Sequence, residues 1–210
     1  MAGRPATVDL PPAATGASSP AMHPLRRPGL LAAFALAAVL ASAADPVLRI
    51  DREKSFVDVD VKATVDSFTG RLEKYQAVVT TDPSGRIRAA TFDFRFADLK
   101  TGKADRDAKM LEWLGAADAA GKFELGVLAL TPSGQGQANG RLTFHGATQR
   151  IEFPVTVARA DRSYTITGEV TIDHRNWGLK VIRLMALLKV DPEVRIRFRL
   201  AGELPPPAEE

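Results

Sequence analysis

Apolar and polar residues alternate with a period of two over most of this chain, and the alternation limits the fold more than any other feature. Residues 57–62 read Val-Asp-Val-Asp-Val-Lys, and similar runs cover residues 92–96, 151–157, 165–172 and 194–200. Successive side chains of a β-strand point to opposite faces, so these runs predict strands with one dry face and one solvated face. Such one-sided burial is typical of antiparallel sheets.

Turn-forming residues separate the predicted strands at short and even intervals. Residues 82–85 (Asp-Pro-Ser-Gly) predict a hairpin that joins a strand at 72–80 to the strand around Phe92. Residues 132–136 and 161–163 separate later strands in the same way. Many strands with short connections favour an all-β sandwich or barrel.

One segment has a different period. Met110, Leu111 and Leu114 recur at helical spacing within Thr101–Leu114, and two aspartates lie near the start of this segment. The pattern predicts one short amphipathic helix with favourable negative charge at its N-terminus. A second apolar stretch, Val181–Leu188, suits either a helical turn or a buried strand, and periodicity does not choose between them.

Residues 1–44 predict an export signal that is separate from the fold. Two arginines at 26–27 precede an apolar run at 30–40, which leads into small residues ending at Ala43 and Ala44. A positive flank, a short apolar core and an Ala-x-Ala site are the features of a secretory signal peptide, with cleavage near these two alanines. The apolar run is too short to cross a bilayer comfortably, which disfavours the alternative of an N-terminal anchor helix.

This interpretation divides the chain into three parts. Within the N-terminal part, Met22 is a better start than Met1, because it leaves a signal peptide of ordinary length after a segment rich in Pro, Ala and Ser. Residues 45–204 have the length of one domain. Residues 205–210, which are rich in Pro and Glu, predict a frayed tail.

Charge and cysteine content exclude several classes of protein. The whole chain carries a net charge of +3, and without the three arginines and one aspartate of residues 1–44 the net charge is +1. This near-neutral balance provides no electrostatic footprint for nucleic acid. The chain has no cysteine, which excludes disulfides, thiolate chemistry, cysteine-ligated metals and a lipid anchor on an N-terminal Cys. With the export signal, these features predict a soluble protein of the bacterial periplasm or exterior.

Outside residues 1–44 the chain has two histidines, His145 and His174, and each lies where a predicted strand meets a turn. Neither an H-x-x-x-H nor an H-E-x-x-H pattern is present, so the sequence predicts no metal site. Polar residues at strand edges most often bond to backbone or water, and we interpret both histidines in this way. The alternative is a hydrolase or isomerase that uses one of them. It needs a carboxylate or hydroxyl within hydrogen-bond reach of the imidazole inside a cleft.

Other catalytic motifs are absent from the sequence. It contains no G-x-S-x-G elbow, no P-loop and no G-x-G-x-x-G. Asp105, Arg106 and Asp107 have the composition of an acid–base cluster. Their place at a helix start is explained more simply by capping and by the helix dipole. We therefore predict that the protein is not an enzyme.

If the strands close into a barrel, their apolar faces share its interior. Parity places the following residues on this inner face: Val57, Val59, Val61, Phe92, Phe94, Phe96, Leu142, Phe144, Phe153, Ile166, Val170, Phe198 and Leu200. The interior of a barrel of about eight strands is either filled by side chains or lined as one apolar cavity. Gly168 falls on the inner face and favours local space. The residues by themselves leave both alternatives open, and the predicted helix would cover one end of the barrel.

Six landmarks occur in order between Val47 and Leu204. They are Phe68-Thr-Gly70, Phe92-x-Phe94-x-Phe96, Thr101-Gly102 with Arg106-Asp107 and Met110-Leu111, Gly140-Arg-Leu-Thr-Phe-His-Gly146, Ile172-Asp-x-Arg-Asn-Trp-Gly178, and Asp191-x-x-Val-x-Ile-x-Phe. In their order and spacing the chain resembles the YceI-like family of bacterial lipid- and polyisoprenoid-binding proteins. The resemblance implies a lipocalin-like, eight-stranded antiparallel β-barrel with one helix and a long apolar tunnel. It also implies export, and a polyprenyl chain such as that of an isoprenoid quinone as the ligand.

The resemblance favours a lined cavity over a filled barrel. We predict an exported carrier or reservoir that binds a long isoprenoid lipid non-covalently, with no metal and no catalytic cofactor. The residues predicted to line the tunnel are Phe92, Phe94, Phe96, Leu142, Phe144, Ile166, Val170 and Phe198, with Met110, Trp113 and Trp177 near an opening. Transient membrane contact and a homodimer are compatible with this function. The alternative is a cell-envelope interaction or stress protein with a filled barrel, no lipid ligand and an exposed apolar patch.

Overall fold

The computed structural model describes residues 45–64, 66–116, 119–184 and 188–206. The chain divides into two compact units, Met1–Ser42 and Ala43–Glu210, and the described residues all belong to the second unit. The predicted signal peptide, its cleavage site and the start at Met22 lie outside the described residues, as does the end of the predicted tail. Among the described residues, no helix is long and apolar enough to cross a membrane.

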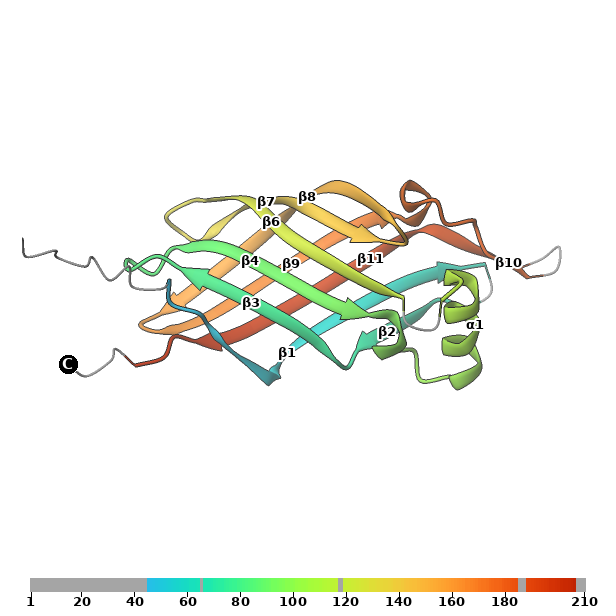
Figure 1. Cartoon of the computed structure of the whole chain (residues 1–210), viewed down its shortest axis with the longest axis horizontal. Helices are drawn as coiled ribbons and strands as arrows, with labels where there is room; N and C mark the ends of the chain where they lie inside the picture. Colours follow the sequence, from blue (N-terminus) through green and yellow to red (C-terminus); the bar gives the residue numbers. More distant parts are fainter. Residues whose placement is uncertain (1–44, 65, 117–118, 185–187, 207–210) are drawn as a thin grey trace, which may run out of the picture. The chain divides into compact units, whose positions relative to one another are not determined.

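The described part of this unit is an antiparallel sheet with one α-helix (Figure 1). Neighbouring strands follow the order β3-β4-β6-β7-β8-β9-β11-β1-β2-β5, and β10 pairs with β11. The elements are β1 (Arg49–Ala63), β2 (Phe68–Leu72), β3 (Tyr75–Thr81), β4 (Ile87–Arg95), the 3-10 helix η1 (Phe96–Asp98), β5 (Leu99–Lys100), α1 (Ala104–Leu114), β6 (Ala120–Leu130), β7 (Gln135–Phe144), β8 (Ala147–Ala160), β9 (Ser163–Asp173), the 3-10 helix η2 (His174–Trp177), β10 (Arg183–Leu184) and β11 (Leu188–Glu203). The all-β class, the antiparallel pairing and the single short helix are confirmed.

The sheet has more strands than the eight that were predicted. The run that predicts one strand at 72–80 is interrupted at Glu73 and Lys74, so it forms the end of β2 and most of β3. Two further strands, β5 and β10, are only two residues long, which is too short to give a recognisable alternation. The predicted turns are confirmed, since they join the antiparallel neighbours β3 and β4, β6 and β7, and β8 and β9. In the stretch 181–188, Arg183–Leu184 is a strand, and residues 185–187 lie outside the described residues.

The sheet curls because β1 and the residues just before it contact both parts of the interrupted run. The second half of β1 pairs with β2. Just before β1, Val47 forms a bridge with Thr80 of β3, and the Leu48 amide donates to the Val79 carbonyl (2.8 Å). These contacts bring the β3 end of the sheet to β1 and give the barrel its interior.

The pairing of β1 with β11 shows how the alternation produces two different faces. Val57 lies opposite Phe198 on the inner face. One residue further along, Asp58 lies opposite Arg197 on the other face and forms an ion pair with Arg71 of β2 (2.8 Å). Opposite charges in such positions stabilise strand pairing. A slip of one residue would turn the valines outward and the charges into the lumen, so the alternation specifies the register.

Helix α1 begins and ends at residues with specific local roles. Lys103 at the N-cap makes no side-chain capping bond. Instead, Asp107 in the first turn accepts hydrogen bonds from the Thr101 amide (3.0 Å) and the Thr101 hydroxyl (2.6 Å). Gly115 follows the helix with a φ of 74°, a conformation that glycine adopts without steric cost. Asp107 therefore stabilises the helix start, as its position in the sequence predicted.

Candidate ligand-binding cavity

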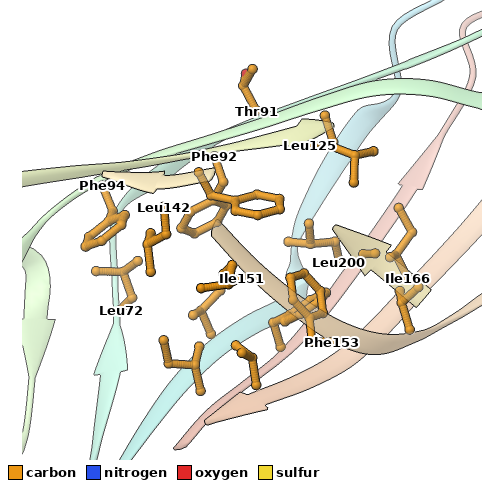
Figure 2. A pocket seen from close by; sticks show the side chains of 18 of the residues that line it. Leu72, Thr91, Phe92, Phe94, Leu125, Leu142, Ile151, Phe153, Ile166 and Leu200 are labelled. Atoms are coloured by element: carbon orange, nitrogen blue, oxygen red, sulfur yellow. The ribbon is translucent and has the colours of Figure 1, made fainter. Parts of the chain in front are cut away.

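The interior of the barrel contains a cavity of about 210 Å³, which we call the lumen cavity. Among the described residues that line it, Thr91 alone has a polar side chain. Figure 2 shows Phe92, Phe94 and Leu142 converging on the cavity, whereas Thr91 lies on the opposite face of β4. One water molecule needs about 10–15 Å³ of such volume, so the cavity has room for a much larger apolar ligand. The lining residues are Val57, Val59, Leu72, Val79, Ile87, Ala90, Thr91, Phe92, Phe94, Phe96, Leu99, Phe123, Leu125, Leu128, Ala138, Leu142, Phe144, Ile151, Phe153, Val155, Val157, Ile166, Val170, Ile172, Ile196, Phe198 and Leu200.

The alternative of a filled barrel is wrong, because it predicts no cavity. That alternative also places the apolar site on the surface. The large apolar side chains that are exposed in the described part of the chain are Val47 before β1, and Val127 and Leu130 on β6. A few exposed apolar residues are ordinary on protein surfaces. The interior is therefore the stronger candidate site.

The eight residues predicted to contact a lipid tail all lie on the wall of the lumen cavity. They come from β4, η1, β7, β9 and β11. They are Phe92, Phe94, Phe96, Leu142, Phe144, Ile166, Val170 and Phe198. Parity along each strand placed them on the inner face, and the closed sheet brings them together. Their contact with a lipid stays a prediction.

Two aromatic rings of the wall occupy space beside glycines on neighbouring strands. Phe94 lies directly opposite Gly121, and Phe198 lies directly opposite Gly168. A Cβ atom would be 2.2 Å from the Phe94 ring at Gly121, and 2.6 Å from the Phe198 ring at Gly168. The expectation of free space at Gly168 is therefore wrong, because the Phe198 ring fills it. Rings placed over glycines extend less far into the lumen, which helps to keep the cavity open.

Part of the cavity wall was not predicted from the sequence. Ile151 and Val155 line the lumen cavity, and the alternation of residues 151–157 was the signal that could have placed them in the site. Leu125 and Leu128 also line it, although strict parity would put them on opposite faces. The register between β6 and β7 shifts after Leu125, because a bulge inserts an extra residue and turns Leu128 inward. Nothing in the local sequence pattern shows such a bulge.

A second hollow, which we call the mouth recess, has a volume of about 1100 Å³ and is lined by residues of α1 and of the barrel strands. It shares Val59, Leu99, Phe144 and Ile172 with the lumen cavity, so the two spaces adjoin. Met110 and Trp113, which were predicted to lie near an opening, are on its wall.

Charged side chains of both signs line the mouth recess. Three are acidic and three are basic: Asp66, Asp105, Glu112, Lys103, Arg106 and Lys109. Arg106 pairs with Asp66 (3.2 Å) and lies over the Phe68 ring (3.9 Å from its centroid). The Trp113 indole N–H donates to the Lys180 carbonyl (2.8 Å). These contacts attach α1 to the barrel. No group of three or more potential metal ligands occurs among the described residues.

Trp177, which was predicted to lie near an opening, lines neither the lumen cavity nor the mouth recess and packs behind Phe144, which lines both. Its side chain is 2% exposed, and its ring stacks on Phe144 with 4.6 Å between the centroids. The indole N–H donates to the Leu142 carbonyl (3.0 Å). Trp177 therefore supports two residues of the cavity wall. The alternation of faces ends after β9, because residues 174–177 form the 3-10 helix η2. An odd or even position therefore does not predict where the Trp177 side chain points.

His145 has the structural role that was predicted for a histidine at a strand end. It follows β7 with a φ of 48° and is exposed. Its Nδ1–H donates to the Trp177 carbonyl (2.9 Å). This partner is a backbone oxygen, whereas the catalytic alternative requires a carboxylate or a hydroxyl.

His174 has a different environment from that of His145, because its ring is buried rather than exposed at the strand edge. It is 5% exposed, both ring nitrogens are closed off from solvent, and the Leu179 backbone lies close enough to the imidazole to favour its protonated form. The ring lies edge-on to Trp113, with 4.9 Å between the centroids, and lines the mouth recess. Burial lowers the pKa of His174 from 6.5, and the negative charge of Asp173 acts in the opposite direction. The first turn of η2 buries this side chain, which the strand pattern did not predict.

Comparison with known proteins identifies the domain. The family model described as "YceI-like domain" matches residues 48–201, which is nearly all of the described unit. No curated protein matches the chain.

Several solved structures share the fold. BcnA from Burkholderia cenocepacia is 22% identical with a TM-score of 0.63, and the match covers 73% of this chain and 99% of that one. A polyisoprenoid binding domain from Saccharophagus degradans, implicated in plant cell wall breakdown, is 18% identical with a TM-score of 0.62, over 77% of this chain and 100% of that one. A YCEI protein from Campylobacter jejuni is 14% identical with a TM-score of 0.53, over 66% and 86%. At these identities the similarity concerns the fold alone.

Proposed function

The chain belongs to the YceI-like family, and we propose that it is an exported carrier or reservoir that binds a long isoprenoid lipid inside its barrel. The choice of ligand is supported by the Saccharophagus degradans domain, which has the same fold and is described as polyisoprenoid-binding. Export is supported by the positive flank, apolar run and small residues within 1–44. In this role the protein exchanges its lipid with a membrane through transient contact.

The apolar lumen cavity carries this proposal. A surface without hydrogen-bonding or charged groups suits a hydrocarbon and disfavours a polar ligand. Burying each methylene of a tail contributes about 0.8 kcal/mol before the costs of ordering the ligand. An isoprenoid chain with many carbons would therefore bind well without any polar contact in the lumen.

Binding rather than catalysis fits the chemistry of the lumen. Its described lining contains no carboxylate, imidazole or amine that could act as a base or nucleophile. The hydroxyl of Thr91 belongs to a side chain on the far face of β4 (Figure 2). An apolar enclosure of this kind can hold a lipid but offers no group to transform it.

Native mass spectrometry of protein purified under gentle conditions tests the proposal. We expect a bound mass in the range of an isoprenoid lipid. Adding a polyprenyl quinone to delipidated protein should change the Trp fluorescence in a saturable way. Repeated recovery of empty protein, together with no fluorescence response to the quinone, would overturn the proposal.

Two neighbouring alanines on β4 provide a matched pair of variants. Ala90 lines the lumen cavity, whereas Ala89 is exposed. Ala90→Phe should occupy space needed by the tail and weaken binding about tenfold or more, since excluding two methylenes already corresponds to about 1.6 kcal/mol. Ala89→Phe should bind like the unchanged protein. Equal affinities for the two variants would place the ligand outside the lumen.

A further inference from the structure

The pairing between β4 and β6 stops halfway along the barrel. The two strands pair over residues 91–95 and 120–124, at the end of the barrel nearer α1. Residues 87–90 of β4 and 125–130 of β6 continue beyond this ladder, and no backbone pairing joins these described stretches to each other. Figure 1 shows the two strands separating toward the end of the barrel away from α1. We call the gap between the two unpaired stretches the side slit.

A β-bulge lies in the unpaired stretch of each strand. In β4 the register against β3 shifts at Arg88, and in β6 the register against β7 shifts at Gly126. Bulges bend a strand and end its pairing, and they are common at the rims of barrels. They also make the edge of a strand a poor template for a strand from another chain. The side slit is therefore a consequence of the geometry of both strands, and it is unsuited to pairing with a second copy of the chain.

Contacts across the end of the barrel hold β4 away from β6. The Tyr164 hydroxyl of β9 donates to the Gly85 carbonyl (2.8 Å), and Arg159 of β8 donates to the Ser84 carbonyl (2.7 Å). In the order of strands, β6 and β7 lie between β4 and these two partners, so the bonds cross the barrel. The turn between β3 and β4 therefore spans the end of the barrel that lies away from α1, and the opening that remains there is at the side.

The side slit leads to the lumen cavity. Ile87 and Ala90 on one edge of the slit belong to the cavity wall, and so do Leu125 and Leu128 on the other edge. All four side chains are apolar, and each is partly exposed. A hydrocarbon tail that passes between the two strands therefore stays on apolar surface until it reaches the lumen.

The outer rim of the side slit has the composition of a surface that contacts lipid. Val127 and Leu130 of β6 are 63% and 40% exposed, and they are two of the three large apolar side chains exposed in the described part of the chain. On the β4 side, Arg86 and Arg88 are exposed. Single exposed apolar residues are ordinary on protein surfaces. Here two of them flank an opening of the lumen beside two basic side chains, a combination that favours an anionic membrane surface.

We propose that the side slit rests on an anionic lipid surface and passes the isoprenoid tail between the bilayer and the lumen cavity. This inference rests on the proposed function. It adds the route of the tail and the face of the barrel that contacts the membrane. On this route the tail does not pass the charged side chains of the mouth recess.

Transfer of a polyprenyl quinone from vesicles of phosphatidylcholine and phosphatidylglycerol tests the inference. The transfer to delipidated protein is followed by Trp fluorescence. The double variant Val127→Asp/Leu130→Asp should slow it about tenfold or more, because the two charged side chains oppose insertion into the bilayer. The affinity for the quinone dispersed in detergent should stay within about 2-fold of that of the unchanged protein, since neither residue lines the lumen cavity.

Val47→Asp is the matched control. Val47 is an apolar side chain that is 45% exposed, and it lies beside β3 rather than at the side slit. The control should leave the transfer rate unchanged. Arg86→Glu/Arg88→Glu should slow transfer from the anionic vesicles and leave transfer from vesicles of phosphatidylcholine alone unchanged, because only the former attract basic side chains.

A dye on a single introduced cysteine locates the contact directly, because the chain has no cysteine of its own. A polarity-sensitive dye on Val127→Cys should shift its emission to shorter wavelength when the anionic vesicles are added. The same dye on Lys109→Cys, at an exposed position of the mouth recess, should keep its emission unchanged.

Four outcomes would overturn the inference. In the first, the double variant at Val127 and Leu130 transfers quinone at the unchanged rate, and in the second Val47→Asp slows transfer equally. In the third, the dye responds at Lys109 and not at Val127, which places the membrane contact at the mouth recess. In the fourth, the unchanged protein forms a dimer that the double variant does not form, which assigns the rim to a second copy. Quinone binding in detergent leaves the proposed function standing in all four cases, whereas absence of binding from detergent and vesicles alike removes both.

Discussion

The lumen cavity and the mouth recess adjoin each other, yet they are built from opposite kinds of surface. The lumen is lined by strands whose inner faces are apolar, with Thr91 as the only polar residue of its described lining. The recess is lined partly by α1 and η2, and it combines balanced charges with the buried imidazole of His174. The difference teaches that one barrel can separate two tasks. The strands form an apolar container, whereas the helical segments at the mouth add charged and polar side chains.

The largest expected difference between the two spaces is the loss of stability when a charge is introduced. Leu142 is 5% exposed on the lumen wall, so Leu142→Asp places a carboxylate among apolar side chains. We expect the free energy of unfolding to fall by about 3–5 kcal/mol, the range seen when a buried charge lacks a partner. Lys109→Asp, at an exposed position on the wall of the mouth recess, should cost about 1 kcal/mol or less, as most surface changes do. Urea denaturation followed by circular dichroism measures both, and equal losses would contradict the distinction between the two spaces.

Filling the space beside a wall glycine should have the next largest effect. Gly121→Ala places a methyl group where the Phe94 ring lies, and the ring must move into the lumen. Such overpacking costs about 1–3 kcal/mol. The same substitution in a Phe94→Leu background should cost less, because the ring that causes the clash is gone. A double-mutant cycle checks this, and additive losses would show that the ring and the glycine are independent.

Loosening the helix over the recess should have a smaller effect. Trp113→Phe removes the hydrogen bond from the indole to the Lys180 carbonyl and keeps an aromatic ring in place. The expected loss is about 1 kcal/mol. Hydrogen exchange should become faster in α1 and stay unchanged in the strands around the lumen. Faster exchange throughout the barrel would instead show that the recess and the lumen unfold together.

The smallest expected effect is a pH dependence that comes from the recess. Burial lowers the pKa of His174 below 6.5, so below that pH the unfolded chain takes up a proton before the folded protein does. The free energy of unfolding is therefore at its full value above about pH 6.5 and falls as the pH decreases through this window. Asp173, whose pKa is lowered to about 2, contributes only in more acidic solution.

Thermal denaturation between about pH 7.5 and pH 5 measures this dependence, because the unfolded chain takes up the His174 proton in that range. His174→Phe should make the decline less steep. An identical pH profile for the variant would show that other groups produce it.

The strand faces could be predicted from the sequence, and the segments beyond the strands could not. Phe92, Phe94 and Leu142 were placed on the inner face by parity, and all three line the lumen cavity. The face of the sheet to which a side chain points depends only on whether its position along the strand is odd or even. It can therefore be predicted without knowing the partner strand. The same rule failed for Leu128 after a bulge and for Trp177 within a 3-10 helix. At both places a change in backbone conformation interrupts the alternation of side chains between the two faces of the sheet.

The two histidines show most clearly what could not be predicted from the local sequence. Both lie at the ends of strands in similar sequence contexts, and one interpretation was given to both. His145 is exposed and bonds to the Trp177 carbonyl, whereas His174 is buried against Trp113 from a helix distant in sequence. Burial of a side chain at a strand end is decided by what packs against it. No local pattern contains that information.

The amino-acid sequence by itself determined the antiparallel barrel class, the inner face of most strands and the family. These depend on alternation and on motif order, which are local properties of the chain. Only the tertiary structure decided that Phe198 fills the space beside Gly168, that the sheet closes through Val47 and Thr80, and that His174 faces the mouth recess. Each of these joins segments far apart in the sequence, and the register and docking that bring them together are properties of the folded chain as a whole.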